Sequence, residues 1–181
     1  ALKTQPTNIS LVGYDTNQET LKSAISDKII DKTGDLQECV MSADILVLAL
    51  SPHLIAELIP ELPDLVNSHT VITDVASVKY SIKESLNFTP HDFQIRFVLG
   101  HPIAGSEKSG YAAGNKRLFN NRNVILTPDS SVLASSVATI NELWRLTGAN
   151  VLGLELERHD KILALTSHLP HLLAYTMVDV L

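Results

Sequence analysis

The side chains best suited to chemistry gather in residues 98–110, which read VLGHPIAGSEKSG. This segment follows an expected strand over residues 95–99, and Pro102 disfavours helical backbone at the preceding His101. Loops at the carboxyl ends of strands are where open α/β sheets bind ligands and do chemistry. We therefore expect His101 in a rigid loop at a strand end, as a proton acceptor that titrates near neutrality. A turn in which the histidine only contacts neighbouring backbone remains the alternative.

Two further segments carry groups of polar side chains. Residues 74–79 read DVASVK, after an expected buried strand, and three of the seven histidines lie at His159, His168 and His171. At about 100° per residue, His168 and His171 share one side of a helix and His159 faces nearly the opposite way. This arrangement does not favour a metal site on one unbroken helix, so we expect none.

Together these segments resemble the prephenate dehydrogenase family. Residues 101–110 are similar to the family's His-Pro-[Met/Ile]-x-Gly-[Ser/Thr]-Glu-Lys-Ser-Gly signature, and residues 74–79 to its Asp-x-Gly-Ser-Val-Lys, with Ala76 in place of the glycine. His159-Asp160, followed by SHLPH at 167–171, matches a third motif in the same order. The resemblance implies NAD as cofactor and a hydride transfer that ends in loss of carbon dioxide.

The resemblance also implies roles for individual residues. His101 would accept the proton of the substrate hydroxyl, while Ser77 would bond that hydroxyl and lie close to the nicotinamide. The substrate would contact Ser106, Glu107, Lys108 and His171. The cofactor would contact Asp15, Ser51, Pro52 and Ser77. The arginine that captures a substrate carboxylate in the family has no match within residues 1–181.

Several of these residues also have an ordinary structural interpretation. Ser77 would suit the N-cap of an expected helix over 79–86, and Asp15 a turn or helix N-cap. Ser51 and Pro52 are equally typical of a strand end followed by a helix start. Ser106, Glu107 and Lys108 would otherwise form a solvated loop, and His168 a buried, hydrogen-bonded histidine.

Alternating strand and helix patterns predict a Rossmann-like, doubly wound, mainly parallel sheet over residues 1–153. The expected strands cover 9–14, 45–50, 70–75, 95–99, 123–127 and 150–152; the expected helices cover 18–26, 35–41, 52–61, 79–86 and 131–147. Residues 154–181 predict the first helix of a helical domain, kinked or broken at Pro170. Its apolar face, which includes Leu165, Leu169 and Leu172, predicts a homodimer.

The sequence contains no Gly-x-Gly-x-x-Gly turn, the element that binds a dinucleotide pyrophosphate. We therefore expect that the chain begins after that turn and stops within the helical domain, and that the isolated polypeptide does not bind NAD. Asp15, at the end of the strand expected over 9–14, predicts NAD rather than NADP, because a carboxylate repels a 2′-phosphate.

Composition sets the remaining limits. A net charge of −6 and an isoelectric point near 5.6 give no basic surface for nucleic acid. Apolar runs are too short to span a membrane, and no signal peptide pattern is present. The single cysteine, Cys39, predicts a small core residue and a reducing cytoplasm.

The sequence favours an NAD-dependent prephenate dehydrogenase that makes 4-hydroxyphenylpyruvate for tyrosine synthesis. An arogenate dehydrogenase on the same scaffold remains open, as does an inactive fragment that only folds and dimerises.

Overall fold

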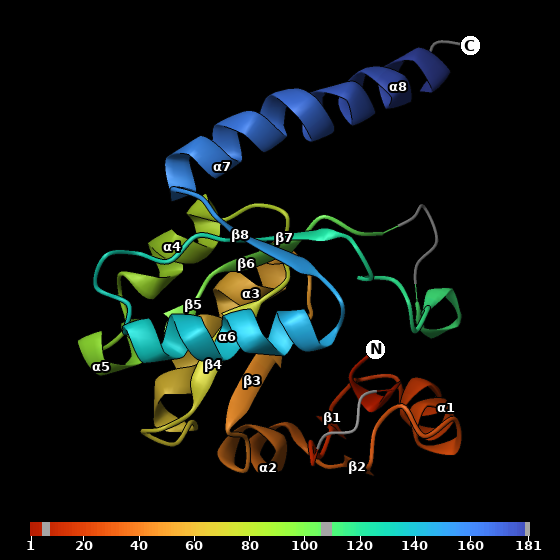
Figure 1. The fold of residues 1–181 in the computed structure, drawn as a ribbon, viewed down its shortest axis with the longest axis vertical. Coiled ribbons are helices and arrows are strands. Elements are labelled where there is room, and N and C mark those ends of the chain that lie inside the picture. Colours follow the sequence, from red (N-terminus) through yellow and green to blue (C-terminus); the bar gives the residue numbers. More distant parts are fainter. Residues whose placement is uncertain (5–7, 106–109, 180–181) are drawn as a thin grey trace.

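The computed structural model describes residues 1–4, 8–105 and 110–179, and its α/β fold is shown in Figure 1. Strands and helices alternate up to residue 153, and a helical segment follows. The strands are β1 (Val12–Gly13), β2 (Lys32–Thr33), β3 (Ile45–Leu48), β4 (Val71–Asp74), β5 (Phe97–Val98), β6 (Gly100–Pro102), β7 (Asn123–Leu126) and β8 (Asn150–Gly153). The α-helices are α1 (Gln18–Ser26), α2 (Leu36–Met41), α3 (Pro52–Leu58), α4 (Tyr80–Leu86), α5 (His91–Gln94), α6 (Ala134–Leu146), α7 (Leu156–Leu163) and α8 (Leu169–Asp179).

The strand pairing confirms the expected mainly parallel arrangement. β1 pairs with β2, and β3, β4 and β5 pair in that order, all in parallel. β6, β7 and β8 form a third group, in which β6 and β7 are antiparallel and β7 and β8 parallel. Between β5 and β6 the backbone changes partner, because the Leu99 carbonyl accepts from the Thr127 amide at 3.0 Å.

Helices cover both faces of these strands, as a doubly wound fold requires. On one face, apolar side chains of α3, α4 and α5 pack on β3 and β4 around Ile72. On the other face, Ile140 and Trp144 of α6 pack against Val98 and Val124. Figure 1 shows α6 in front of the strands and α3 and α4 behind them. Cys39 is buried in α2, as the sequence predicted.

Polar side chains determine where several helices begin. Asn17 accepts from two amides at the start of α1, and Asp35 forms a capping box with Glu38 at the start of α2. Ser51 accepts from the Leu54 amide, and Pro52 is the first residue of α3. These signals explain why the predicted starts of these helices are accurate.

Three local predictions were wrong in detail. The strand expected over 95–99 is shorter, at Phe97–Val98, and a second strand, Gly100–Pro102, follows it because the chain switches partner at Leu99. The helix expected over 52–61 changes into a 3-10 turn at Ile59–Asp64. Of the kink or break expected at Pro170, the break was wrong, since the helical path continues as α8; the regular helix is instead interrupted by a π-helical turn at Ala164–His168, directly before Leu169 and Pro170. Within the described residues, no helix is both long and apolar enough to cross a membrane.

Candidate active site

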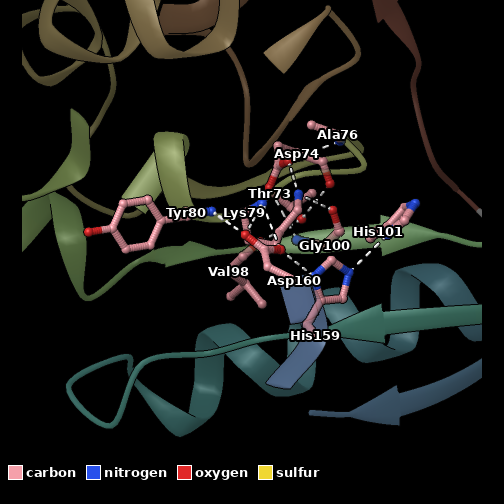
Figure 2. A network of polar contacts seen from close by, with 10 residues as sticks. All are labelled: Thr73, Asp74, Ala76, Lys79, Tyr80, Val98, Gly100, His101, His159 and Asp160. Atoms are coloured by element: carbon pink, nitrogen blue, oxygen red, sulfur yellow. Dashed lines mark hydrogen bonds and ion pairs between the residues drawn. The ribbon is translucent and has the colours of Figure 1, made fainter. Parts of the chain in front are cut away.

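A buried network of polar contacts joins the end of β4 and the first two residues of β6 to the middle of α7 (Figure 2). Asp74 ends β4 and pairs with the Lys79 ammonium, and neither side chain has exposed surface. Lys79 Nζ also donates to the Gly100 carbonyl at 2.6 Å, while the Gly100 amide donates to Asp74 Oδ1 at 3.1 Å. The ion pair therefore holds the Gly100 backbone from its donor and acceptor sides.

Burial opposes charge on both members of this pair. It raises the pKa of Asp74, which the Lys79 ammonium counteracts, and it lowers the pKa of Lys79, which the Asp74 carboxylate counteracts. The amides of Gly100 and Ala76 also bond the carboxylate and favour its charged form. Breaking the pair would leave one buried charge uncompensated, which is strongly destabilising.

His101 lies in the middle of β6, opposite Ile125 of β7. The prediction that it occupies a loop was therefore wrong: the partner switch at Leu99 extends strand geometry through Pro102. Its ring is almost buried, with 8% of the residue exposed. Burial, and then the neighbouring His159, Lys79 and His168, lower the pKa of His101 to about 4, against an opposing effect of Asp160. His101 is thus neutral near pH 7, the form that can accept a proton.

His159 and Asp160 connect His101 to helix α4. His101 Nδ1 lies 2.9 Å from His159 Nε2, and His159 Nδ1 lies 2.6 Å from Asp160 Oδ1. The two rings meet edge to face with centroids 5.1 Å apart, and His159 is fully buried. The Asp160 carboxylate also accepts from the amides of Lys79 and Tyr80, at 3.2 Å and 2.9 Å. A side chain from α7 therefore caps α4.

Ser77 lies between Asp74 and Lys79 in the turn after β4, and is half-buried. The interpretation of Ser77 as N-cap of the following helix was wrong. Its hydroxyl makes no side-chain hydrogen bond within the described part of the chain, and Asp160 performs the capping instead. Among the described residues, the Ser77 hydroxyl is thus not committed to a hydrogen bond.

The residues expected at the cofactor follow the carboxyl ends of β1 and β3. Asp15 is half-buried, and its Oδ1 accepts from the Asn17 amide at 2.8 Å. Its interpretation as a turn residue is confirmed, and that as a helix N-cap was wrong, since Asn17 caps α1. Ser51 and Pro52 form a helix start, as their structural interpretation predicted.

These residues fit a dinucleotide at two of its parts. The carboxylate of Asp15 suits ribose hydroxyls, and the hydroxyls of Ser51 and Ser77 suit the nicotinamide end. Residues 1–181 contain no Gly-x-Gly-x-x-Gly sequence for the pyrophosphate. In residues 1–4, 8–105 and 110–179, no three His, Cys, Asp or Glu side chains are grouped as for a metal ion.

Four further residues were predicted to contact the substrate. Ser106, Glu107 and Lys108 lie outside the described residues. His171 is exposed on α8, and His168 is half-buried in the π-helical turn. The interpretation of His168 as a buried core histidine was wrong, because the residue is only half-buried.

Sequence reasoning assigned no role to Asp74, Lys79, His159 or Asp160, although it singled out both segments. A signal was present in each segment: an acidic residue ending a buried strand with a lysine five positions later, and an adjacent His-Asp pair. Only the fold shows that Lys79 of the first pair bonds Gly100 and that His159 of the second pair contacts the adjacent His101.

The fold and the site together define a nucleotide-binding domain of Rossmann-like type with a histidine at its centre. The sequence model of the prephenate dehydrogenase nucleotide-binding domain matches residues 1–153. The chain therefore belongs to the prephenate dehydrogenase family.

Three relatives place the chain within this family. It is 35% identical over 146 residues to the cyclohexadienyl dehydrogenase of Zymomonas mobilis, covering 81% of this chain and 49% of that protein. The Aquifex aeolicus prephenate dehydrogenase, solved with hydroxyphenyl propionate and NAD+, superposes with a TM-score of 0.90 at 31% identity, over 99% of this chain and 63% of that one. The arogenate dehydrogenase of Synechocystis gives a TM-score of 0.84 at 25% identity, over 99% and 62%.

The chain spans about half the length of the curated relatives it matches, from 41% to 49% among the first three.

Proposed function

We propose that this chain carries the cofactor-binding and proton-accepting part of an NAD-dependent dehydrogenase that converts prephenate to 4-hydroxyphenylpyruvate. The observation that carries the proposal is His101: a nearly buried, neutral imidazole, held by β6 and by His159, within a family signature. A neutral imidazole in a fixed position is suited to general base catalysis.

The proposed reaction needs a proton acceptor beside the C4 hydroxyl of prephenate. NAD supplies the acceptor for the hydride when it is bound. His101 Nε2 takes the hydroxyl proton as the C4–H bond breaks, and Ser77 bonds the same oxygen. The ring carboxylate leaves as carbon dioxide, and its bonding electrons complete the aromatic ring. The proton held on His101 Nε2 returns to the C4 oxygen, which gives the hydroxyl of 4-hydroxyphenylpyruvate and restores the neutral imidazole. Ser106, Glu107, Lys108 and His171 are proposed to contact the substrate.

Asp15, Ser51, Pro52 and Ser77 are the proposed cofactor contacts. The match to a nucleotide-binding domain and the NAD+ in the Aquifex aeolicus complex support this assignment. In the same proposal, residues 1–153 form the NAD-binding domain. Residues 154–181 form the first helix of a helical domain through which the protein forms a homodimer in the cytoplasm.

Arogenate is the second candidate substrate, with an amine in place of the side-chain keto group. The arogenate dehydrogenase of Synechocystis and the cyclohexadienyl dehydrogenase of Zymomonas mobilis, both similar to this chain, support it. Both candidates share the hydroxyl on which His101 acts.

The test is an assay of the intact enzyme, which follows NADH formation with prephenate and with arogenate in parallel. We expect turnover with prephenate and release of carbon dioxide in equal amount. Turnover with arogenate alone would select the second candidate. The absence of NADH formation with either substrate, in a protein shown to be folded, would contradict the proposed function.

A further inference from the structure

In the hydrogen-bonded chain from Asp160 through His159 to His101, the donor and the acceptor of each contact can be assigned. The Asp160 carboxylate accepts from the Lys79 and Tyr80 amides and also contacts His159 Nδ1 at 2.6 Å (Figure 2). An ionised carboxylate has no proton to donate. His159 must therefore carry a proton on Nδ1.

The contact between His159 and His101 determines which ring nitrogen of His101 carries the proton. A neutral imidazole with its proton on Nδ1 has only a lone pair on Nε2. His159 Nε2 lies 2.9 Å from His101 Nδ1, so His101 is the donor of that hydrogen bond. The opposite direction would require a second ring proton, and therefore a net positive charge, on His159.

The assignment leaves the lone pair of His101 on Nε2. This atom has no hydrogen-bond partner among the described residues, and Figure 2 shows the ring at the edge of the network with its other nitrogen directed away from His159. With the other tautomer, Nε2 would carry a proton and His101 would have no base to offer a substrate.

We propose that His159 and Asp160 are positioning residues that keep the His101 proton on Nδ1, so that Nε2 accepts the proton of the substrate. This inference rests on the proposed function for the identity of that substrate. As Nε2 takes the proton, the positive charge on His101 faces His159 Nε2 through Nδ1–H. The negative charge of Asp160 then acts on it through the His159 ring.

Asp160→Asn reverses the direction of the chain while it keeps the cap of α4. Asp160 Oδ2 accepts from the Tyr80 amide at 2.9 Å and from the Lys79 amide at 3.3 Å, so this one oxygen can hold both amides. Oδ1 faces His159 Nδ1 at 2.6 Å and shares the Lys79 amide at 3.2 Å. The amide oxygen of asparagine will take the Oδ2 position, and its NH₂ group will then donate to His159 Nδ1. His159 Nε2 must carry the proton and donate to His101 Nδ1, so the proton of His101 moves to Nε2.

The experiment combines ¹⁵N NMR of labelled histidine in the intact enzyme with steady-state kinetics. ¹⁵N shifts distinguish protonated from unprotonated ring nitrogens. We expect wild-type His101 to be protonated on Nδ1 alone and the Asp160→Asn enzyme to be protonated on Nε2 alone. We expect kcat to fall by at least about 10²-fold in the variant, with little change in KM and in thermal stability.

Two variants of His159 separate positioning from packing. In His159→Gln, the amide oxygen still accepts from His101 Nδ1, so part of kcat should be retained. In His159→Leu no acceptor is present, and kcat should be lower than in His159→Gln at similar stability. His91→Gln, on the exposed α5 surface, is the matched control and should leave kcat unchanged.

The outcomes separate this inference from the proposed function. A wild-type His101 protonated on Nε2, or an unchanged tautomer in Asp160→Asn, would overturn the inference. So would the expected tautomers combined with an unchanged kcat. The expected tautomers in a protein without turnover on prephenate or arogenate would support the arrangement of the protons and contradict the function.

Discussion

At the scale of single residues, the surroundings of His101 determine its pKa. Burial and neighbouring groups lower its pKa from 6.5 to about 4. Between these two values the unfolded chain binds a proton that the folded protein does not bind. The contribution of His101 to the free energy of unfolding must therefore fall as the pH drops through this window. This contribution is present in full only above pH 6.5.

We accordingly expect the wild-type protein to lose more stability between pH 7 and pH 4 than His101→Asn, which has no group to titrate there. Urea unfolding at a series of pH values measures the difference. His91→Asn, on the surface, should behave as wild type. Parallel stability curves for wild type and His101→Asn would show that the pKa of His101 is not lowered in the folded state.

Asp15 carries a second prediction at this scale. Asp15→Asn keeps an oxygen for the Asn17 amide but loses a charge that would bond ribose hydroxyls and repel a 2′-phosphate. Hydrogen bonds to a charged group contribute about 1.5–3 kcal/mol, so KM for NAD should rise about tenfold or more. The preference for NAD over NADP should narrow in the variant.

Kinetics with both cofactors in the intact enzyme test this prediction, with the exposed neighbour Glu19→Gln as control. Equal use of NAD and NADP by the wild-type enzyme would leave Asp15 only its role in the turn.

The sequence identified His101 but not its partner, and the reason is physical. Helical periodicity separated His159 from His168 and His171, but the π-helical turn at Ala164–His168 interrupts the regular period on which that separation rests. Its function depends on a contact between residues 58 positions apart in the chain, which no local pattern reports. The same holds for Asp160, whose cap serves a helix on a distant segment.

At the scale of elements, helices with clear start signals were predicted well, and short elements were not. β2 has two residues and α5 has four, which is too few to show a period. The hydrophobicity pattern does not reveal the change of strand partner at Leu99, because the residues of β5 and Leu99 are all apolar and buried. This change nevertheless places His101 in a strand, where pairing with Ile125 fixes its backbone.

The packing around Gly100 leaves no room for a side chain at this position. A Cβ atom there would lie 2.9 Å from the Asp74 carbonyl and 3.2 Å from Thr73 Oγ1, so the backbone would have to move. We expect Gly100→Ala to cost about 1–3 kcal/mol of stability. Its kcat should also fall, because the displaced strand carries His101.

Thermal unfolding and kinetics of Gly100→Ala should be compared with Gly105→Ala, where a Cβ would meet nothing within 4 Å. Equal stability and equal kcat in the two variants would show that β6 tolerates movement at Gly100.

At the scale of the whole molecule, α7 and α8 form a long helical segment that extends away from the body (Figure 1). Its apolar side chains are exposed; Leu165, Leu172 and Tyr175 expose 67%, 63% and 76% of their surface. Exposed apolar surface of this extent marks an interaction site. It agrees with the proposed homodimer.

We expect Leu172→Glu in the intact protein to shift a dimer toward monomer, because a carboxylate would be buried in an apolar interface. Sedimentation velocity over a range of concentrations measures the shift. Phe88→Glu is the control, since Phe88 is 88% exposed on the segment after α4. A wild-type monomer, or a Leu172→Glu dimer of unchanged affinity, would contradict the proposed interface.

The proposed role of His101 is to accept the substrate proton during hydride transfer. Its most direct test is kcat for NADH formation from prephenate in the wild-type enzyme and in His101→Asn, with unfolding curves and NAD binding to show that the variant is intact. We expect a loss of about 10²-fold or more in kcat, with KM for prephenate little changed. A His101→Asn enzyme that turns over prephenate at nearly the wild-type rate would contradict it.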